Sequence, residues 1–180
     1  LLGDCDYGIG GGVEVMSRGA YMLPALRSGA RLGNTQAIDM MVDTLTDPFG
    51  VGHMGITAEN LASKWGISRE DQDAFALESQ QRAAKAIAEG RFAGQIVPIT
   101  LKGRKGDTVF DTDEHPRATT LEALAAMKPA FKKDGSVTAG NASGLNDGAA
   151  FLVLADAATA VNAGHKAMAR LVSYAVAGVP

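Results

Sequence analysis

Short apolar runs along the chain predict β-strands. The run from Ala149 to Ala155 is apolar throughout and predicts a buried strand. Residues 96–101 alternate in polarity, with Pro98 indicating an edge or an irregularity, and a basic turn then leads to a returning strand at 108–110. The remaining strands are predicted for the glycine-rich segment 6–13 and for residues 170–177.

Helices are predicted where apolar residues recur every three or four positions. The longest begins after Ser68, which has Asp71 at the capping-box position, and ends at Gly90. Its inner stripe is expected at Phe75, Ser79, Ala83, Ala86 and Ile87, and both Phe75 and Trp65 are expected in the core. Shorter helices are expected at 57–64 before Gly66, at 121–127 behind a Thr119-x-x-Glu122 capping box, at 157–163 before Gly164, and at 35–45 within a loop-rich region spanning 18–52.

The segment 137–148 differs from the rest of the chain because nearly all of its residues are small or turn-forming. Gly140 and Gly144 permit unusual φ angles, and Asn141, Ser143 and Asn146 offer hydrogen bonds. Two interpretations follow: a tight turn before a core strand, or a backbone that a ligand approaches closely.

Composition limits the class of protein. The 180 residues carry a formal net charge of −3, which gives no reason to expect nucleic-acid binding. No run approaches the ~18 apolar residues of a membrane span, so a soluble globular protein is predicted. A single cysteine excludes an internal disulfide framework and favours a reducing, cytoplasmic compartment. Residues 1–4 lack the features of a natural start and are interpreted as the end of a helix.

Several familiar chemistries are not supported. Gly8-x-Gly10 does not complete a dinucleotide-binding fingerprint. Cys5 lies between two aspartates, which disfavour a thiolate, so it is predicted to be structural. The acidic cluster near His115 has neither calcium-loop nor zinc-site spacing, and no metal site is predicted.

Four sequence blocks, in order along the chain, resemble the thiolase family. They are Gly-Gly-Gly-Val-Glu-Val-Met-Ser at 10–17, His-Met-Gly-Ile-Thr-Ala-Glu-Asn at 53–60, Ser-Arg-Glu-Asp-Gln-Asp at 68–73, and Thr-Ala-Gly-Asn-Ala-Ser-Gly-Leu-Asn-Asp-Gly-Ala-Ala at 138–150. Thiolases are acyltransferases that make or cleave 3-oxoacyl-CoA. The resemblance implies a protein that condenses two acetyl-CoA molecules to acetoacetyl-CoA, or cleaves 3-oxoacyl-CoA, with coenzyme A or acyl-CoA as substrate and no tightly bound cofactor. The blocks are most similar to the short-chain branch, although Val13 and Val15 depart from the family's usual Met and Ser and leave the preferred chain length open.

The resemblance also implies binding residues. The side chains expected to line a tunnel for the pantetheine arm are Leu45, His53, Met54, Phe131, Ala139 and Ser143. Arg117 is expected at the nucleotide end of coenzyme A, where a guanidinium suits both phosphate and adenine. Each residue also has a simpler interpretation, since a lone histidine is often structural and Phe131 can serve as a plain apolar anchor. The arginines of region 18–52 either face solvent or, by resemblance, lie in the region where the family's dimers dock into tetramers. A homodimer or homotetramer is expected.

The family's catalytic blocks are absent from this sequence. Its two cysteines, its His-Pro-x-Gly histidine and its Asn-Glu-x-Phe asparagine have no counterpart here, because the only His-Pro, at 115–116, is followed by Arg-Ala. The expectation is therefore an α/β chain from inside a thiolase, whose full fold has five layers, α/β/α/β/α. By resemblance it comprises the end of the N-terminal half at 1–18, a CoA-binding loop domain at 19–144, the last strand and helix of that half at 145–166, and the start of the C-terminal half at 167–180. Such a fragment is expected to be inactive and to fold poorly alone.

Two other functions stay open. A non-catalytic thiolase-like protein would bind acyl-CoA or lipid without condensing it, and a structural interaction module would bind no CoA.

Overall fold

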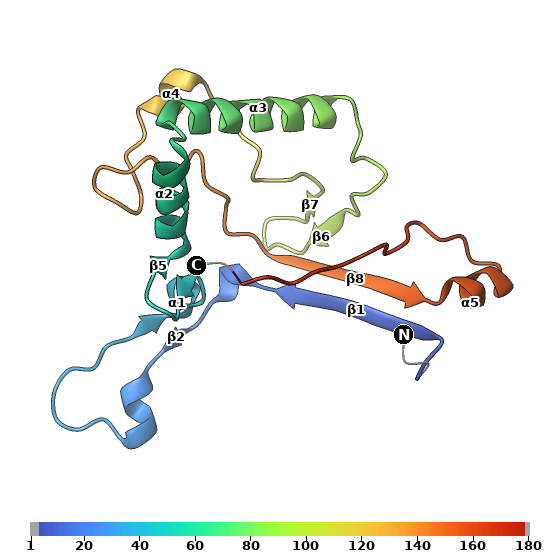
Figure 1. The fold of residues 1–180 in the computed structure, drawn as a ribbon, viewed down its shortest axis with the longest axis horizontal. Helices are drawn as coiled ribbons and strands as arrows, with labels where there is room; N and C mark the ends of the chain where they lie inside the picture. Colours follow the sequence, from blue (N-terminus) through green and yellow to red (C-terminus); the bar gives the residue numbers. More distant parts are fainter. Residues whose placement is uncertain (1–3, 179–180) are drawn as a thin grey trace. The chain divides into compact units, whose positions relative to one another are not determined.

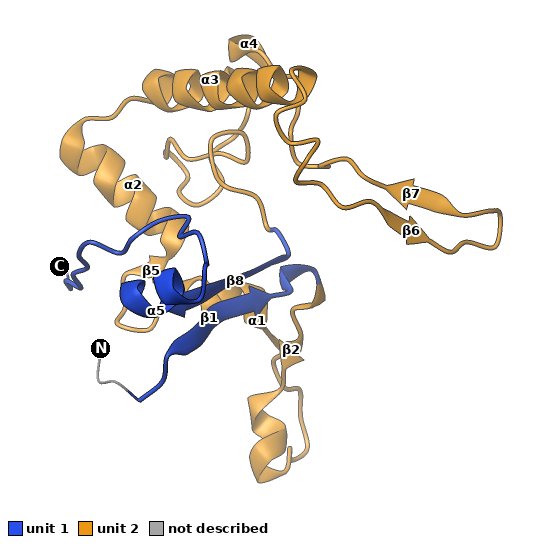
Figure 2. Cartoon of the chain, turned by 90° about the vertical axis from the view of Figure 1, so that its right-hand side faces the viewer, with its two compact units in different colours: residues 1–17, 146–180 blue, residues 18–145 orange. Residues whose placement is uncertain are grey.

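The computed structural model describes residues 4–178 (Figure 1). The chain divides into two compact units, which Figure 2 shows in different colours. One unit contains the chain up to Ser17 and from Asn146 onward, and the other contains Arg18–Leu145. The helix end expected at residues 1–4 falls almost entirely outside the described residues. The predicted four-part domain division stays a prediction.

The first unit is built on an antiparallel ribbon of two strands. β1 (Tyr7–Glu14) pairs along its whole length with β8 (Gly148–Ala155), from Tyr7 opposite Ala155 to Glu14 opposite Gly148. Both strands were predicted, but β8 is exposed along its length in this chain rather than buried. Helix α5 (Ala157–Asn162) follows, capped by the Asp156 carboxylate. The strand predicted at 170–177 is wrong, because these residues do not form a strand and pair with none of the strands among the described residues.

The second unit contains helices joined by short strand pairs. Its main helices are α2 (Met54–Trp65) and α3 (Arg69–Ala88). Its shorter helical elements are α1 (Met40–Thr44), α4 (Leu121–Ala125) and the 3-10 turn η2 (Pro24–Ser28), while η1 (Met16–Arg18) lies at the junction of the two units. Its strands pair antiparallel as β2 (Tyr21–Met22) with β3 (Ile38–Asp39), β4 (Thr46–Asp47) with β5 (Gly52–His53), and β6 (Ile99–Leu101) with β7 (Thr108–Phe110).

Helix boundaries follow local capping chemistry. The Ser68 hydroxyl accepts a hydrogen bond from the Asp71 amide while the Asp71 carboxylate accepts one from the Ser68 amide, so the predicted capping box is confirmed. The predicted helix ends at Gly66, Gly90 and Gly164 are also confirmed, and all three glycines have the positive φ that a side chain disfavours.

Three helix predictions need correction. α2 begins at Met54, three residues before its predicted start, because the His53 side chain caps it. α4 is capped by Thr120, whose hydroxyl accepts from the Ala123 amide, and not by Thr119. The helix predicted at 35–45 shrinks to α1, since Ile38 and Asp39 pair with β2 and the Asp39 carboxylate caps the helix that follows.

The small core of the second unit contains polar as well as apolar residues. Its buried residues include Ala62, Leu124 and Val137, together with the polar Glu59, Asp73 and Thr138. The stripe predicted for α3 is wrong at Phe75, which is 77% exposed, because the face turned inward is the one carrying Asp73. Trp65, also expected in the core, is 69% exposed.

Candidate functional site

The N-terminus of α2 gathers four of the residues predicted to bind coenzyme A. The His53 ring is stacked on Phe131, with centroids 4.8 Å apart and planes inclined by 20°. The Met54 amide donates a hydrogen bond to the Leu45 carbonyl at 2.8 Å. These contacts place an imidazole, a thioether and two apolar side chains in one neighbourhood.

His53 has a structural duty in this arrangement. Its Nδ1 accepts a hydrogen bond from the Gly55 amide at 3.0 Å and so caps α2. A neutral imidazole whose Nδ1 accepts carries its proton on Nε2, so the ring presents an N–H donor on its other side.

Gly55 is required by the close approach of Phe131. A β-carbon at Gly55 would overlap the Phe131 ring. The ring therefore lies directly on the first turn of α2, and the position of Phe131 is set by that helix.

Glu59, one turn further along α2, binds the start of the signature loop, by which we mean residues 136–144. Its carboxylate accepts hydrogen bonds from the Ser136 amide at 2.9 Å, the Val137 amide at 2.8 Å and the Ser136 hydroxyl at 3.2 Å. Burial alone would raise the pKa of the Glu59 carboxyl, but these hydrogen bonds, with the positive charge of Lys132, lower its pKa below the ordinary value.

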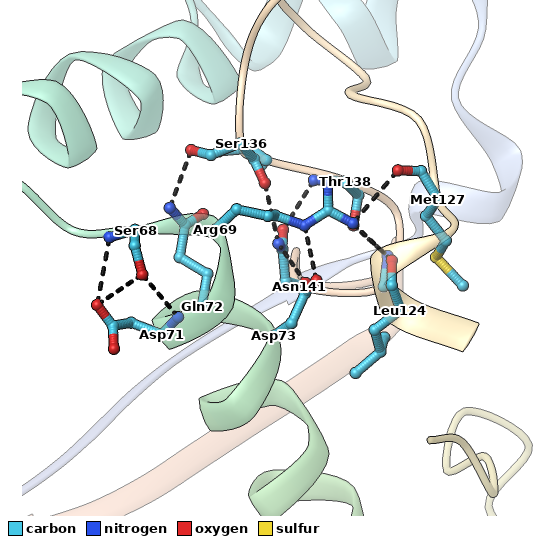
Figure 3. A network of polar contacts seen from close by, with 12 residues as sticks. Ser68, Arg69, Asp71, Gln72, Asp73, Leu124, Met127, Ser136, Thr138 and Asn141 are labelled. Carbon is cyan, nitrogen blue, oxygen red and sulfur yellow. Dashed lines mark hydrogen bonds and ion pairs between the residues drawn. The ribbon is translucent and has the colours of Figure 1, made fainter. Parts of the chain in front are cut away.

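A second set of polar contacts ties the signature loop to α3 (Figure 3). The Asn141 amide nitrogen donates to the Asp73 carboxylate and to the Ser136 carbonyl, both at 3.0 Å, and its oxygen accepts from the Thr138 amide at 2.7 Å. Asp73 also accepts from Arg69 Nε at 2.7 Å. The Arg69 guanidinium in turn donates to the Leu124 carbonyl, so loop, α3 and α4 form one connected network.

The two remaining loop residues predicted to bind substrate, Ala139 and Ser143, are exposed, unlike the fully buried Thr138. Gly140 does not have the unusual φ that was expected, since the glycines with positive φ among residues 4–178 all lie elsewhere. Its lack of a side chain is needed for packing, because a β-carbon there would come within 2.7 Å of the Met127 sulfur.

Arg117 lies on a different part of the second unit. It borders a surface hollow of about 300 Å³ beside α3, and its amide donates to Gln80 Oε1 at 3.0 Å. Gln80 is eleven residues beyond Arg69, roughly 16 Å along the helix axis. The structure therefore brings Leu45, His53, Met54 and Phe131 together at the start of α2, and it places Arg117 beside the middle of α3.

Sequence reasoning missed Glu59 and Asp73 as supports of the signature loop and treated Asn141 as available to a ligand. The signal was present, because Glu59 and Asp73 belong to two of the blocks that resemble the family. Their role required knowing their partners in the loop, which are backbone amides for Glu59 and the Asn141 side chain for Asp73. These contacts span 77 and 68 residues, respectively.

Other candidate chemistry is sparse in the part of the chain that the structure describes. Among residues 4–178, no three histidine, cysteine or acidic side chains gather in a way that would hold a metal ion. None of the described helices combines the length and the apolar character needed to cross a membrane. Cys5 is a free, exposed thiol in the first unit.

Comparisons with known proteins agree with these observations. The family described as Thiolase, N-terminal domain, matches residues 1–158. The chain is 55% identical to a beta-ketothiolase, BktB, of Cupriavidus necator across 99% of its own length, and 56% identical to an acetyl-CoA acetyltransferase of Pseudomonas aeruginosa across 98%. It spans 46% of each of these proteins, a little under half of their length.

Solved structures give the same result. The crystal structure of the Bacillus anthracis acetyl-CoA acetyltransferase is 50% identical, with a TM-score of 0.89 over 99% of this chain and 46% of that one. Human mitochondrial 3-ketoacyl-CoA thiolase is 42% identical, with a TM-score of 0.80 over 89% of this chain and 41% of that one. The predicted thiolase-like α/β fold is thereby confirmed.

Proposed function

Because the chain belongs to the thiolase family, we propose that it is part of an acyl-CoA acyltransferase, and that this segment binds coenzyme A. The complete protein condenses two acetyl-CoA molecules to acetoacetyl-CoA, or cleaves 3-oxoacyl-CoA, through an acyl-enzyme thioester. The observation that carries the proposal is the identity of 55–56% to a beta-ketothiolase and an acetyl-CoA acetyltransferase along nearly the whole chain.

The reaction divides its tasks between this segment and the rest of the protein. It needs a thiolate to carry the acyl group, a base for the α-proton, and donors directed at the thioester oxygens. We assign these groups to parts of the protein beyond this chain, since the sequence has one cysteine, flanked by aspartates, and lacks the His-Pro-x-Gly block. The task left to this segment is to bind and orient the substrate.

The geometry supports that task. The stacked pair of His53 and Phe131 and the residues Leu45 and Met54, which share a backbone hydrogen bond, offer apolar side chains suited to the pantetheine arm. A thioether contacts sulfur and aliphatic groups well. The small residues Ala139 and Ser143 let the arm approach the signature loop, and the Ser143 hydroxyl donates to a pantetheine amide. Arg117 binds the nucleotide end, where its guanidinium meets phosphate and adenine.

The assembly and location belong to the same proposal. Coenzyme A and its thioesters act as substrates, and no tightly bound cofactor takes part. The complete protein is a cytoplasmic homodimer or homotetramer, and the four-part division at residues 18, 144 and 166 describes how this chain contributes to it.

Substituting tryptophan for Ser143 in the complete protein tests CoA binding directly. The indole is expected to fill the space beside the signature loop and to abolish binding, as measured by calorimetric titration with CoA. Ser79→Trp is the matched control, because Ser79 is exposed on α3 and outside the proposed tunnel, and its CoA affinity is expected to equal that of the wild type. Unchanged affinity of Ser143→Trp would show that the loop does not face the substrate.

A thiolysis assay on the same complete protein decides the chemical part. Cleavage of acetoacetyl-CoA by free CoA is expected. CoA binding without any turnover would instead identify a non-catalytic acyl-CoA-binding protein, and the absence of binding would leave only a structural role.

A further inference from the structure

Two buried carboxylates, those of Glu59 and Asp73, form hydrogen bonds with the signature loop. These bonds are made to Ser136, Val137 and Asn141 and not to the exposed Ala139 and Ser143. We propose that both are positioning residues: each fixes one end of the bend at residues 137–141, which carries Ala139 and leads directly to Ser143, and so prepares the loop to receive coenzyme A. The inference rests on the proposed function, because it assigns a role in the binding of that same ligand.

The first anchor lies on one face of α2. Gly55 and Glu59 are four residues apart and therefore lie on the same side of the helix. Phe131 covers Gly55, and the Ser136 and Val137 amides bind Glu59. The segment from 131 to 137 is thus attached to this face at both of its ends.

The backbone at Gly135 approaches the Glu59 carboxylate so closely that a residue with a side chain would not fit there. A β-carbon on Gly135 would lie 2.7 Å from the carboxyl carbon of Glu59. Because the carboxylate accepts from two successive amides, it fixes the backbone direction at the point where the loop begins.

The second anchor lies on α3. Asp73 is 3% exposed and uses one oxygen for Asn141 and the other for Arg69. The Arg69 guanidinium donates to the Leu124 and Met127 carbonyls at 2.5 and 3.2 Å, so α4 and the turn that follows it hold it in place. Through Asp73, the position of the Asn141 side chain is therefore fixed relative to both α3 and α4.

Between the two anchored positions, hydrogen bonds within the loop hold its backbone in place. The Gly140 backbone amide donates to the Thr138 hydroxyl at 3.1 Å, and the Asn141 backbone amide donates to the Thr138 carbonyl at 3.3 Å. The bend is consequently ordered before any ligand arrives, which lowers the entropic cost of binding. Removing an anchor raises that cost even though no contact with the ligand is lost.

The test uses Glu59→Gln and Asp73→Asn in the complete protein, with Glu78→Gln as the control. Glu78 is an exposed glutamate on α3 whose ion pair with Arg82 lies at the surface. For each anchor variant, KM and Kd for CoA are expected to rise about tenfold, the effect of one lost hydrogen bond to a charged group, while kcat changes little. The control is expected to match the wild type.

Amide hydrogen exchange supplies a local readout that general destabilisation would not reproduce. In Glu59→Gln the amides of Ser136 and Val137 are expected to exchange faster, while those in the middle of α3 keep their protection. Where an anchor variant does not fold, Asn141→Ala tests the same link, because it leaves Asp73 paired with Arg69.

The outcomes separate this inference from the proposed function. Faster loop exchange with wild-type CoA affinity would overturn the positioning role while leaving CoA binding intact. Uniformly faster exchange with unchanged KM would reduce both residues to general structural ones. A wild-type protein that binds no CoA would end the proposed function, and the positioning role with it.

Discussion

Asn141 shows how a residue that appears available for a ligand in the sequence serves the fold instead. Both of its amide hydrogens are donated within the chain, to Asp73 and to the Ser136 carbonyl, and its oxygen accepts from the Thr138 amide. The polar groups of the Asn141 side chain are therefore used for hydrogen bonds within the chain. The residues of this loop that are exposed, Ala139, Ala142 and Ser143, are small.

Glu59 makes the stability of the complete protein depend on pH. Its folded-state pKa is lowered, so its contribution to the free energy of unfolding is fully present above the unfolded pKa and disappears as pH falls through the folded value. Relative to Glu59→Gln, the wild type is expected to be more stable by about 1.5–3 kcal/mol above about pH 5, and this difference is expected to shrink below about pH 4. Urea denaturation of both proteins between pH 3.5 and 7 measures it, and a difference independent of pH would contradict the assigned cause.

At the scale of elements, helix ends are set by neighbours in the sequence. The Ser68 capping box, the Asp39 and Asp156 caps, and the glycine after α2 all involve residues within a few positions of the terminus they serve. Such interactions satisfy backbone groups that the helix itself leaves unpaired.

Ser68→Ala is expected to destabilise the complete protein by about 1 kcal/mol, since it removes the acceptor for the Asp71 amide at the start of a 20-residue helix. Urea denaturation measures the loss. Ser79→Ala, an exposed substitution within the same helix, is the matched control and should change stability by less than about 0.5 kcal/mol. Equal effects of the two substitutions would argue against the cap.

The same distinction explains what the sequence could predict. The presence of β1 and β8, the hairpin of β6 and β7, and the ends of α3 follow from local pattern and were predicted, although β6 begins at Ile99 and not at residue 96 and β8 is exposed. The α3 stripe failed because the face that packs is chosen by distant groups: Asp73 turns inward to meet Arg69 and Asn141, which leaves Phe75 exposed. A strand at 170–177 was inferred from apolar composition alone, and a strand needs a partner.

Only part of the candidate site could be predicted from the sequence. The grouping of His53, Met54 and Phe131 could be anticipated from the resemblance, whereas the support given by Glu59 and Asp73 could not. A pattern of residue types shows which groups a ligand could meet, but the partners of a buried carboxylate depend on the folded backbone.

At the scale of the whole molecule, the chain buries little of its surface. Its accessible area is 15570 Å², whereas a compact protein of its 18.6 kDa mass exposes roughly 8,200 Å². The exposed large apolar residues include Phe151, Leu152, Val153 and Leu154 on β8.

Expressed alone, residues 1–180 are therefore expected to aggregate or to melt without a cooperative transition, because the exposed apolar surface of the β1–β8 ribbon favours association. Circular dichroism during heating and binding of an apolar dye provide the measurements, with the complete protein as the control. A soluble monomer that unfolds cooperatively and catalyses thiolysis would contradict this expectation.

The pairing of β1 with β8 also has a consequence during synthesis. About 130 residues separate Glu14 from its partner Gly148, so at translation rates of roughly 5–20 residues per second β1 leaves the ribosome several to about thirty seconds before β8. The intervening unit, whose contacts are all available earlier, has time to fold first. Substitutions that delay its folding would lengthen the period in which a glycine-rich strand waits unpaired in the nascent chain.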